Sequence, residues 1–304
     1  MRARRVLILA GMIAALAATS VAAQGRGNAF GRSRARPSSP TSSGSGSSSS
    51  GSTSRSSSSP SLSGDSLAVR QFGAWLDDAS LLEPDHGWAA LSFGYSRALG
   101  ARQSDFPIVE AGVGLSRRAQ FGATLPYYRL HFPDGTGAGG FGDAYLNVKY
   151  LLVDPVRSRS KVGVAVSPLV EVLNVPDPTT GSRLSWAVPI SVEVRRSDYR
   201  VYGSAGYFAR GAIFSSGALE VPVTNRLIVT GALIQMRSLN DSSAADTLGL
   251  SKNRMDLAGA SAYFVMPSVA AFGSVGRTIS QAGPLGASLM LNGGVSISFA
   301  GVSH

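Results

Sequence analysis

The chain of 304 residues contains no cysteine and has a formal net charge of +10. Without cysteine it cannot form disulfides, thiolate metal sites or a lipoprotein anchor on a cysteine. Residues 1–66 contain eight arginines and one acidic residue, Asp65, so they account for seven of the ten positive charges. The rest of the chain is close to charge balance, and a basic folded surface that binds nucleic acid is therefore not predicted.

Residues 1–23 have the pattern of a signal peptide. Three arginines lie within the first five residues, the run from Val6 to Ala18 is apolar, and small residues precede Gln24. The apolar run is shorter than the roughly 20 residues that a membrane-spanning helix needs, so cleavage near residue 23 and export are expected.

Two segments follow before the main pattern begins. Residues 24–66 are rich in serine and glycine and contain too little apolar surface to form a core, which predicts a disordered linker. An alternative is a tail that binds peptidoglycan or a partner. Residues 67–86 leave a helix and a strand open, because Val69, Phe72, Leu76 and Ala79 fit one helical face and an extra strand also fits.

From residue 87 to Phe299, apolar residues alternate with small or polar ones. The alternation is clearest in residues 184–195, where the apolar set is Leu184, Trp186, Val188, Ile190, Val192 and Val194. A period of two predicts a strand with one apolar and one polar face. About twelve such strands can be drawn: 87–97, 107–117, 119–130, 141–153, 160–173, 183–195, 199–209, 212–223, 226–237, 254–266, 268–279 and 286–299.

Some features of these strands stay open. In the strands at 226–237 and 254–266, either face could be the apolar one. Four prolines fall inside the pattern, where each removes a backbone donor, so strand ends or bulges are expected there. These prolines are Pro126, Pro168, Pro189 and Pro222.

The connections between the strands also alternate. Links after even strands are short, whereas most links after odd strands are longer, such as 98–106, 131–140, 174–182 and 238–253. Short turns at one end and long loops at the other are typical of outer-membrane barrels. The predicted fold is therefore all-β: an antiparallel transmembrane β-barrel of about 12 strands over residues 87–299, with a disordered N-terminal tail and a C-terminal tail at 300–304. A soluble β-sandwich is the alternative, but its inner faces need bulky residues.

Residues 110–153 contain a run that resembles a known family. Glu110–Leu115 leads to a Pro-Tyr strand at Phe121–Arg129, and a turn containing Gly140, Gly142 and Asp143 enters a strand with Lys149 beside Tyr150. This pattern is similar to the outer-membrane proteins of the "MetA-pathway of phenol degradation", or transporter, family. The resemblance implies passage of aromatic compounds. Asp143 itself is expected to bond nearby backbone amides as a turn residue.

No enzyme and no cofactor are predicted. His86, His131 and His304 lie in loops or at the terminus, without metal-ligand spacing. Gly135, Gly137 and Gly140 satisfy G-x-G-x-x-G, but a strand and not a helix follows them, which excludes a dinucleotide site.

Charged residues on the polar faces of the strands are the candidate functional residues. They are Glu110, Lys149, Glu171, Glu193 and Arg195. Charge facing lipid is costly, so these side chains are expected to line the lumen. Two readings stay open: a selectivity lining for permeants, or internal ion pairs that fill the barrel.

Taken together, these features predict a passive outer-membrane channel for small molecules, with aromatic or apolar compounds as the class that the resemblance implies. The alternative is a structural or anchoring barrel with a filled lumen. The expected partners are outer-membrane lipid, a small-molecule permeant and the barrel assembly machinery, with no nucleic acid.

Overall fold

The computed structural model describes residues 76–98, 101–155, 158, 160–174, 181–209, 211–239, 253–280 and 287–300. The predicted signal peptide and the linker at 24–66 lie outside these residues, as do residues 301–304. Within the described residues, no helix is long and apolar enough to cross a membrane.

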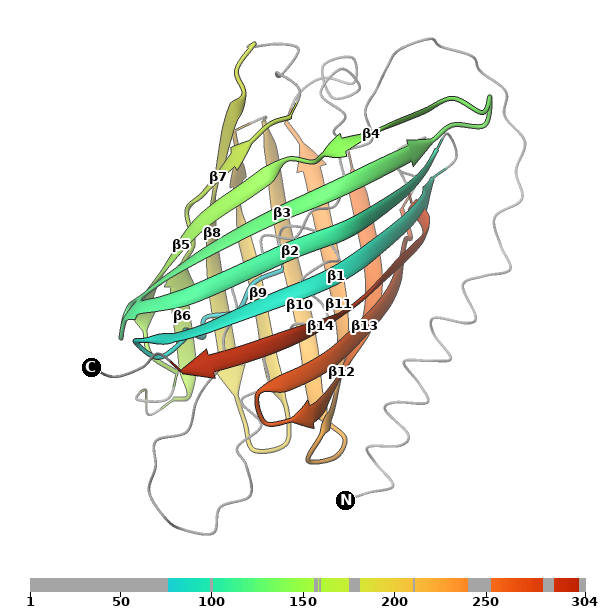
Figure 1. Ribbon diagram of the computed structural model, residues 1–304. Coiled ribbons are helices and arrows are strands. Elements are labelled where there is room, and N and C mark those ends of the chain that lie inside the picture. Colours follow the sequence, from blue (N-terminus) through green and yellow to red (C-terminus); the bar gives the residue numbers. More distant parts are fainter. Residues whose placement is uncertain are drawn as a thin grey trace.

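The described chain is a closed antiparallel barrel (Figure 1). Its first strand pairs with its last, β1 with β14, from His86↔Ala300 to Ala98↔Ala287. The strands are β1 His86–Ala98, β2 Arg102–Ser116, β3 Ala119–His131, β4 Gly137–Phe141, β5 Ala144–Val153, β6 Val162–Val166, β7 Leu169–Val172, β8 Leu184–Arg195, β9 Arg200–Phe208, β10 Ala212–Pro222, β11 Leu227–Ser238, β12 Arg254–Met266, β13 Val269–Thr278 and β14 Ala287–Ala300.

Fourteen strands give a twelve-strand barrel, because two barrel strands are each interrupted once. Both β4 and β5 pair with β3, and both β6 and β7 pair with β8. Each pair therefore continues one barrel strand across a short break. The predicted number of strands and the all-β barrel fold are confirmed.

The prolines in the strands explain these two breaks. Pro126 of β3 lies opposite the first break, where its carbonyl oxygen accepts from Gly142 N at 2.7 Å. Pro189 of β8 lies opposite the second, where its carbonyl accepts from Ser167 N at 2.9 Å, and Pro168 is itself in that break. Proline cannot return a hydrogen bond from its nitrogen, so the ladder is interrupted on the side that each carbonyl faces.

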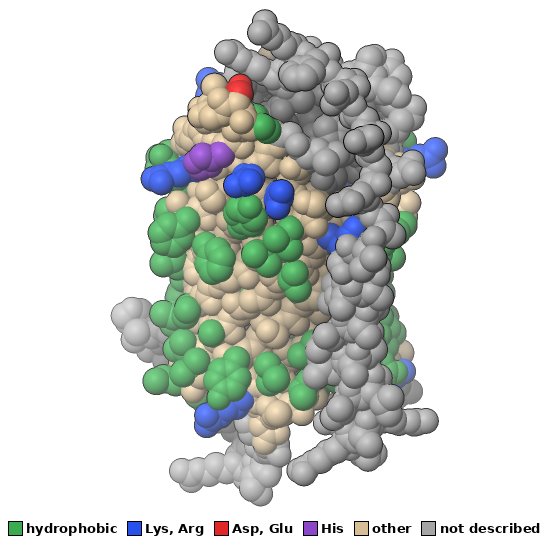
Figure 2. Space-filling view, turned by 90° about the vertical axis from the view of Figure 1, so that its right-hand side faces the viewer, with side chains coloured by type: hydrophobic (Ala, Val, Ile, Leu, Met, Phe, Trp, Pro, Cys, Tyr) green, Lys and Arg blue, Asp and Glu red, His purple; other side chains and the backbone are tan. Residues whose placement is uncertain are grey.

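The apolar face of each strand points outward. In β8, Trp186 and Ile190 are 50% and 52% exposed, while Ser191 and Glu193 on the opposite face are fully buried. Figure 2 shows hydrophobic side chains over the outer surface and lysine and arginine toward both ends. A soluble protein would bury these side chains, whereas a bilayer accommodates them. The chain is thus an outer-membrane barrel.

The structure also settles the two strands whose orientation the sequence left open. In β11, Ile228, Thr230 and Ile234 are buried in the interior and Leu233 is exposed. In β12, the residues that face inward include Arg254 and Asp256, and Tyr263 on the other face is exposed. The pattern in β11 was ambiguous because both of its faces carry bulky apolar residues.

Two predicted long connections are wrong. The link at 98–106 is short, since β2 already begins at Arg102 and Ala98 N donates to Ala101 O at 3.0 Å. The alternation continues there because Gln103 and Asp105 both face inward, joined by a 2.8 Å hydrogen bond. The predicted loop at 131–140 is also shortened, because β4 pairs with β3 as far as His131↔Gly137.

Residues 76–85, here called the inner segment, lie inside the barrel. These ten residues contain no helix and no strand, and the rest of the segment for which the sequence left a helix or a strand open, residues 67–75, lies outside the described residues. Glycines on the inner wall make room for them. A Cβ added at Gly114 of β2 would lie 2.1 Å from the carbonyl oxygen of Glu83, and one at Gly163 of β6 would lie 3.0 Å from Ala79 Cβ.

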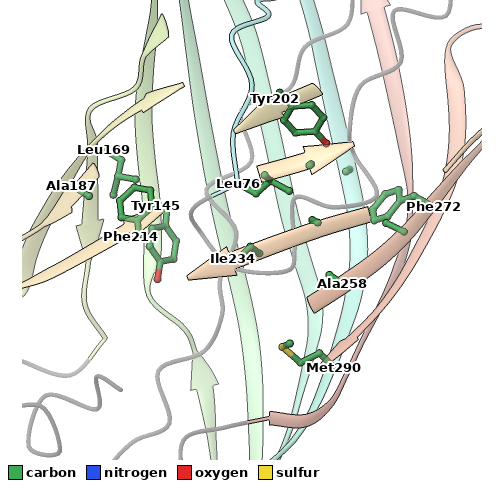
Figure 3. Packing of buried hydrophobic residues seen from close by; sticks show 14 of the residues in the cluster. Leu76, Tyr145, Leu169, Ala187, Tyr202, Phe214, Ile234, Ala258, Phe272 and Met290 are labelled. Carbon is green, nitrogen blue, oxygen red and sulfur yellow. The ribbon is translucent and has the colours of Figure 1, made fainter. Parts of the chain in front are cut away.

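Much of the remaining inner wall is apolar. The strands from β10 to β14 contribute Phe214, Ile234, Ala258, Phe272 and Met290 to one cluster of buried side chains, which also includes Leu76 of the inner segment (Figure 3). The sequence predicted small and polar residues on this face, and these larger apolar side chains are an addition to that expectation. The interior therefore has a largely apolar side, which also contains an inward ion pair of β12, Arg254 with Asp256, and a charged side.

Candidate functional site

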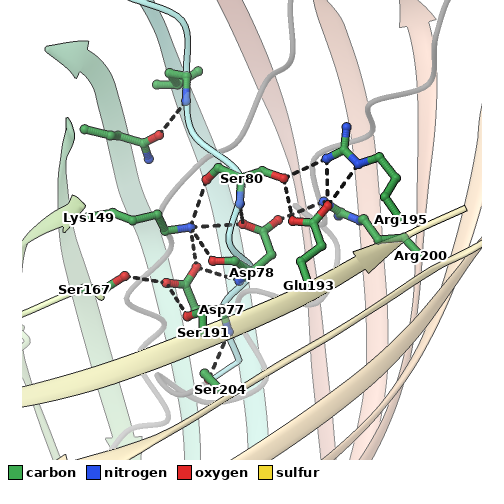
Figure 4. Close-up of polar contacts among 12 residues, drawn as sticks. Asp77, Asp78, Ser80, Lys149, Ser167, Ser191, Glu193, Arg195, Arg200 and Ser204 are labelled. Carbon is green, nitrogen blue, oxygen red and sulfur yellow. Dashed lines mark hydrogen bonds and ion pairs between the residues drawn. The ribbon is translucent and has the colours of Figure 1, made fainter. Parts of the chain in front are cut away.

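The charged side of the interior is a network between the inner segment and the barrel wall (Figure 4). At its centre is Asp77. Lys149 Nζ of β5 lies 2.8 Å from Asp77 Oδ1. Ser167 Oγ donates to Asp77 Oδ2 at 2.9 Å, and Ser191 Oγ of β8 donates to the same oxygen at 3.3 Å. The Asp77 amide donates to Ser204 Oγ of β9 at 3.3 Å.

Asp78 links Lys149 to a second cation. Its Oδ1 accepts from Lys149 Nζ at 3.0 Å, and its Oδ2 accepts from Arg200 Nη1 at 3.0 Å. Arg200, at the start of β9, is also paired with Glu220 of β10 through two hydrogen bonds, of 3.1 and 2.9 Å. Its guanidinium lies 4.7 Å from the centre of the Tyr202 ring. Arg200 therefore keeps a wall partner that does not depend on the inner segment.

Ser80 forms the third attachment point. Its hydroxyl donates to Glu193 Oε2 at 2.6 Å and accepts from Arg195 Nη2 at 2.7 Å. Glu193 and Arg195 are themselves paired at 2.8 Å within β8. Two residues further, Leu82 N donates to the side-chain oxygen of Gln120 of β3 at 2.8 Å. The strands β3, β5, β8 and β9, together with Ser167 in the break between β6 and β7, thus hold an extended segment along its length.

The network is buried, so the loss of any one of its charged partners is costly in free energy. Lys149, Glu193 and Ser191 have no exposed surface, and Asp78 is 1% exposed. A buried pair contributes little net stability relative to apolar packing, but removal of one partner leaves a buried charge unpaired and costs about 3–5 kcal/mol. The wall and the inner segment therefore depend on one another.

The five candidate lumen residues all lie on inward-facing sides of their strands. Lys149, Glu193 and Arg195 belong to the network, and the Arg195 side chain is 24% exposed. Glu171 of β7 is 3% exposed and accepts from the Tyr145 hydroxyl at 2.8 Å. Glu110 of β2 is buried at 2%.

Sequence reasoning missed several members of the site. Arg200 and Glu220 could have been found from the alternation, since Arg200 shares its face with Tyr202 and Ser204. Asp77 and Asp78 gave no strand signal, and only the adjacent carboxylates in an apolar stretch could have drawn notice. A separate inward pair, Arg254 with Asp256 at 2.8 Å, lies in β12.

The predicted turn at Gly140, Gly142 and Asp143 lies at the first strand break. A Cβ on Gly142 would lie 2.8 Å from Pro126 Cγ, so the close approach to β3 requires glycine. Asp143 Oδ1 accepts from Asn174 N, at the end of the next barrel strand, at 2.9 Å. This turn joins β4 to β5, and Asp143 bonds a backbone amide of the neighbouring barrel strand.

In the described part of the chain, no group of three or more His, Cys, Asp or Glu could hold a metal ion.

Comparison with known proteins supports the fold alone. No protein-family model matches the sequence, and a search of curated proteins found no relative. Among solved structures, the NanC porin superposes with a TM-score of 0.50 and 11% identity over 69% of this chain and 98% of the porin. An outer-membrane channel from Pseudomonas putida F1 has a TM-score of 0.53 and 12% identity over 73% of this chain and 98% of the channel. The chain therefore has the fold of outer-membrane β-barrel channels.

Proposed function

We propose that the chain is an outer-membrane channel for the passive passage of small molecules, and that the inner segment closes it. The observation that carries this proposal is that residues 76–85 fill the charged side of the interior without joining the sheet. The barrel closes through β1 and β14 and needs no strand from this segment. Displacement of the segment would therefore leave the barrel intact and clear the charged side of its interior.

The two sides of the interior fit a permeant with apolar and polar parts. Phe214, Phe272 and Met290 face inward from one side, and the charged network lies on the other. The resemblance at residues 110–153 implies aromatic permeants, and an apolar wall that contains two phenylalanines is consistent with that class. Aromatic or apolar small molecules are accordingly the permeants that we propose.

The test is conductance and liposome swelling with full-length protein and a variant whose inner segment is displaced. In Gly114→Ala, the new Cβ would overlap the carbonyl oxygens of Glu83 and Leu82, so this end of the inner segment and β2 cannot keep their present spacing. Gly217→Ala is the matched control, since that glycine has no neighbouring atom within 4 Å of an added Cβ. We expect Gly114→Ala to raise conductance and solute entry above the level of the wild type and of the control. If all three proteins remain silent in the bilayer, the channel proposal is wrong.

A second candidate is a structural or anchoring barrel whose interior is permanently filled. The full burial of Lys149, Ser191 and Glu193 favours it. In this case, Gly114→Ala should lower stability without producing any conductance. The two candidates therefore give opposite results in the same experiment.

A further inference from the structure

We propose that the inner wall carries a carboxylate-binding site, formed by Lys149, Ser167 and Ser191. Asp77 fills the site in the closed barrel, and a small monocarboxylate takes its place when the inner segment is displaced. The role of this ligand as a permeant rests on the proposed channel function, whereas the site itself does not.

The site has the donors that a carboxylate needs. Lys149 Nζ contacts Asp77 Oδ1 at 2.8 Å, and the hydroxyls of Ser167 and Ser191 donate to Oδ2 at 2.9 and 3.3 Å. Both carboxylate oxygens are thus bound, one by an ammonium and the other by two hydroxyls. Hydrogen bonds to an ionised acceptor are about twice as strong as neutral ones. The donors come from β5, from the break between β6 and β7, and from β8, so the barrel itself sets their spacing.

Lys149 requires an anion at this position. Among the described residues, every polar contact of its ammonium group is with residues 77–80: the Asp77 and Asp78 carboxylates and the carbonyl oxygens of Asp78 and Ser80. Displacement of the inner segment would remove all of these partners and leave an unpaired cation on the inner wall, which is costly wherever the side chain stays shielded from water. An incoming anion would relieve that cost.

The charge of the wall favours one carboxylate. Without the inner segment, the network retains three cations, Lys149, Arg195 and Arg200, and two carboxylates, Glu193 and Glu220. The remaining network therefore has a net charge of +1, which a single carboxylate neutralises. Leu76, next to Asp77 in the chain, belongs to the same apolar cluster as Tyr145 and Tyr202 (Figure 3). A monocarboxylate with an apolar or aromatic body matches both surroundings.

The first test is chemical rescue. The side chain of Asp77 ends in the equivalent of acetate, so Asp77→Ala leaves a site that acetate can enter if the protein is refolded in its presence. We expect Asp77→Ala to unfold at a lower urea concentration than the wild type. Acetate should restore at least half of this decrease in the urea midpoint of unfolding. Chloride at equal ionic strength and neutral acetamide should restore nothing. Acetate should also have no effect on the double variant Asp77→Ala/Lys149→Met.

The second test does not depend on the folding of Asp77→Ala. Gly114→Ala retains every charge of the network and shifts the inner segment, so benzoate should bind it in a calorimetric titration. Neutral benzamide is the matched ligand control. In Gly114→Ala/Lys149→Met, the affinity for benzoate should fall at least tenfold.

The outcomes separate the site from the channel. If acetate gives no rescue and benzoate does not bind Gly114→Ala, the carboxylate site is wrong. Equal rescue by chloride would also overturn it, because the effect would then be screening of charge. Benzoate binding without conductance in liposomes would retain the site and reject the channel. Passage of neutral solutes without carboxylate binding would retain the channel and reject the site.

Discussion

Replacement of Lys149 by methionine tests whether the inner segment is an integral part of the folded barrel. Methionine retains the length of the side chain and removes the ammonium, so Asp77 and Asp78 lose their shared partner. The loss of one partner from a buried ion pair costs about 3–5 kcal/mol. Asp77 keeps its two serine donors and Asp78 keeps Arg200. The expected decrease in the free energy of unfolding is therefore at the lower end of that range, about 3 kcal/mol.

The assay is urea unfolding of the refolded protein in detergent, followed by tryptophan fluorescence. With a slope of about 1–3 kcal/mol per M, the midpoint should fall by about 1–3 M. Arg226→Met is the control, because that exposed side chain lies in the turn between β10 and β11. This substitution should change the free energy of unfolding by no more than about 0.5 kcal/mol. The double variant Lys149→Met/Asp77→Asn should be less destabilised than the sum of the two single variants, since neither charge is then left alone.

Two results would refute this reasoning. If Lys149→Met unfolds at the same urea concentration as Arg226→Met, the inner segment contributes no stability through this pair. If the two single variants add without coupling, Lys149 and Asp77 do not interact in the folded protein. A drop in midpoint accompanied by protease cleavage near residue 76 would support release of the segment before the barrel unfolds.

Three further predictions follow from the two faces of the barrel and its inner contacts. Val188→Arg places a charge on the lipid face of β8 and should cost about 2–4 kcal/mol near mid-membrane, measured by unfolding in vesicles; unchanged stability would contradict the assignment of this face. Ser191→Arg should displace the inner segment, because Ser191 is fully buried against Asp77, and increased protease sensitivity of the segment is the expected readout. Glu171→Gln should leave conductance unchanged, because Glu171 is buried and bonds the Tyr145 hydroxyl; altered ion preference would assign it to the permeation path.

The alternation of side chains was sufficient to predict the barrel. It gave the inward position of Glu193 and the outward position of Ile190, because a strand places successive residues on opposite faces whatever its neighbours are. It could not give the breaks in two of the barrel strands, each of which lies opposite a proline of the neighbouring strand. That effect depends on which strands pair and in which register, and neither is a local property of the sequence.

The partners of the candidate site were beyond prediction for a different reason. Asp77 contacts Ser167 and Ser191, which are 90 and 114 residues away in the chain, and Asp78 contacts Arg200 at a separation of 122. No periodicity connects residues at such distances. The segment that contains the two aspartates also has no strand or helix, so its position depends on side-chain contacts and on one backbone hydrogen bond, from Asp85 N to Gly114 O at 3.2 Å.

The small residues on the inner faces do not leave the lumen open, as the sequence suggested, but contact the inner segment. Glycine and serine on the polar faces of the strands indicated a lumen with free space, yet Gly114 and Gly163 contact the inner segment and Ser167 and Ser191 bind Asp77. The same residues that would leave room for a permeant thus receive a segment of the chain itself. The same inner-wall positions would accommodate either a permeant or the inner segment, so a closed wild-type barrel is the expected resting state. The absence of conductance in the wild type alone therefore does not distinguish a channel from an anchor. Only a variant that moves the segment and spares the wall, the effect expected of Gly114→Ala, can make that distinction.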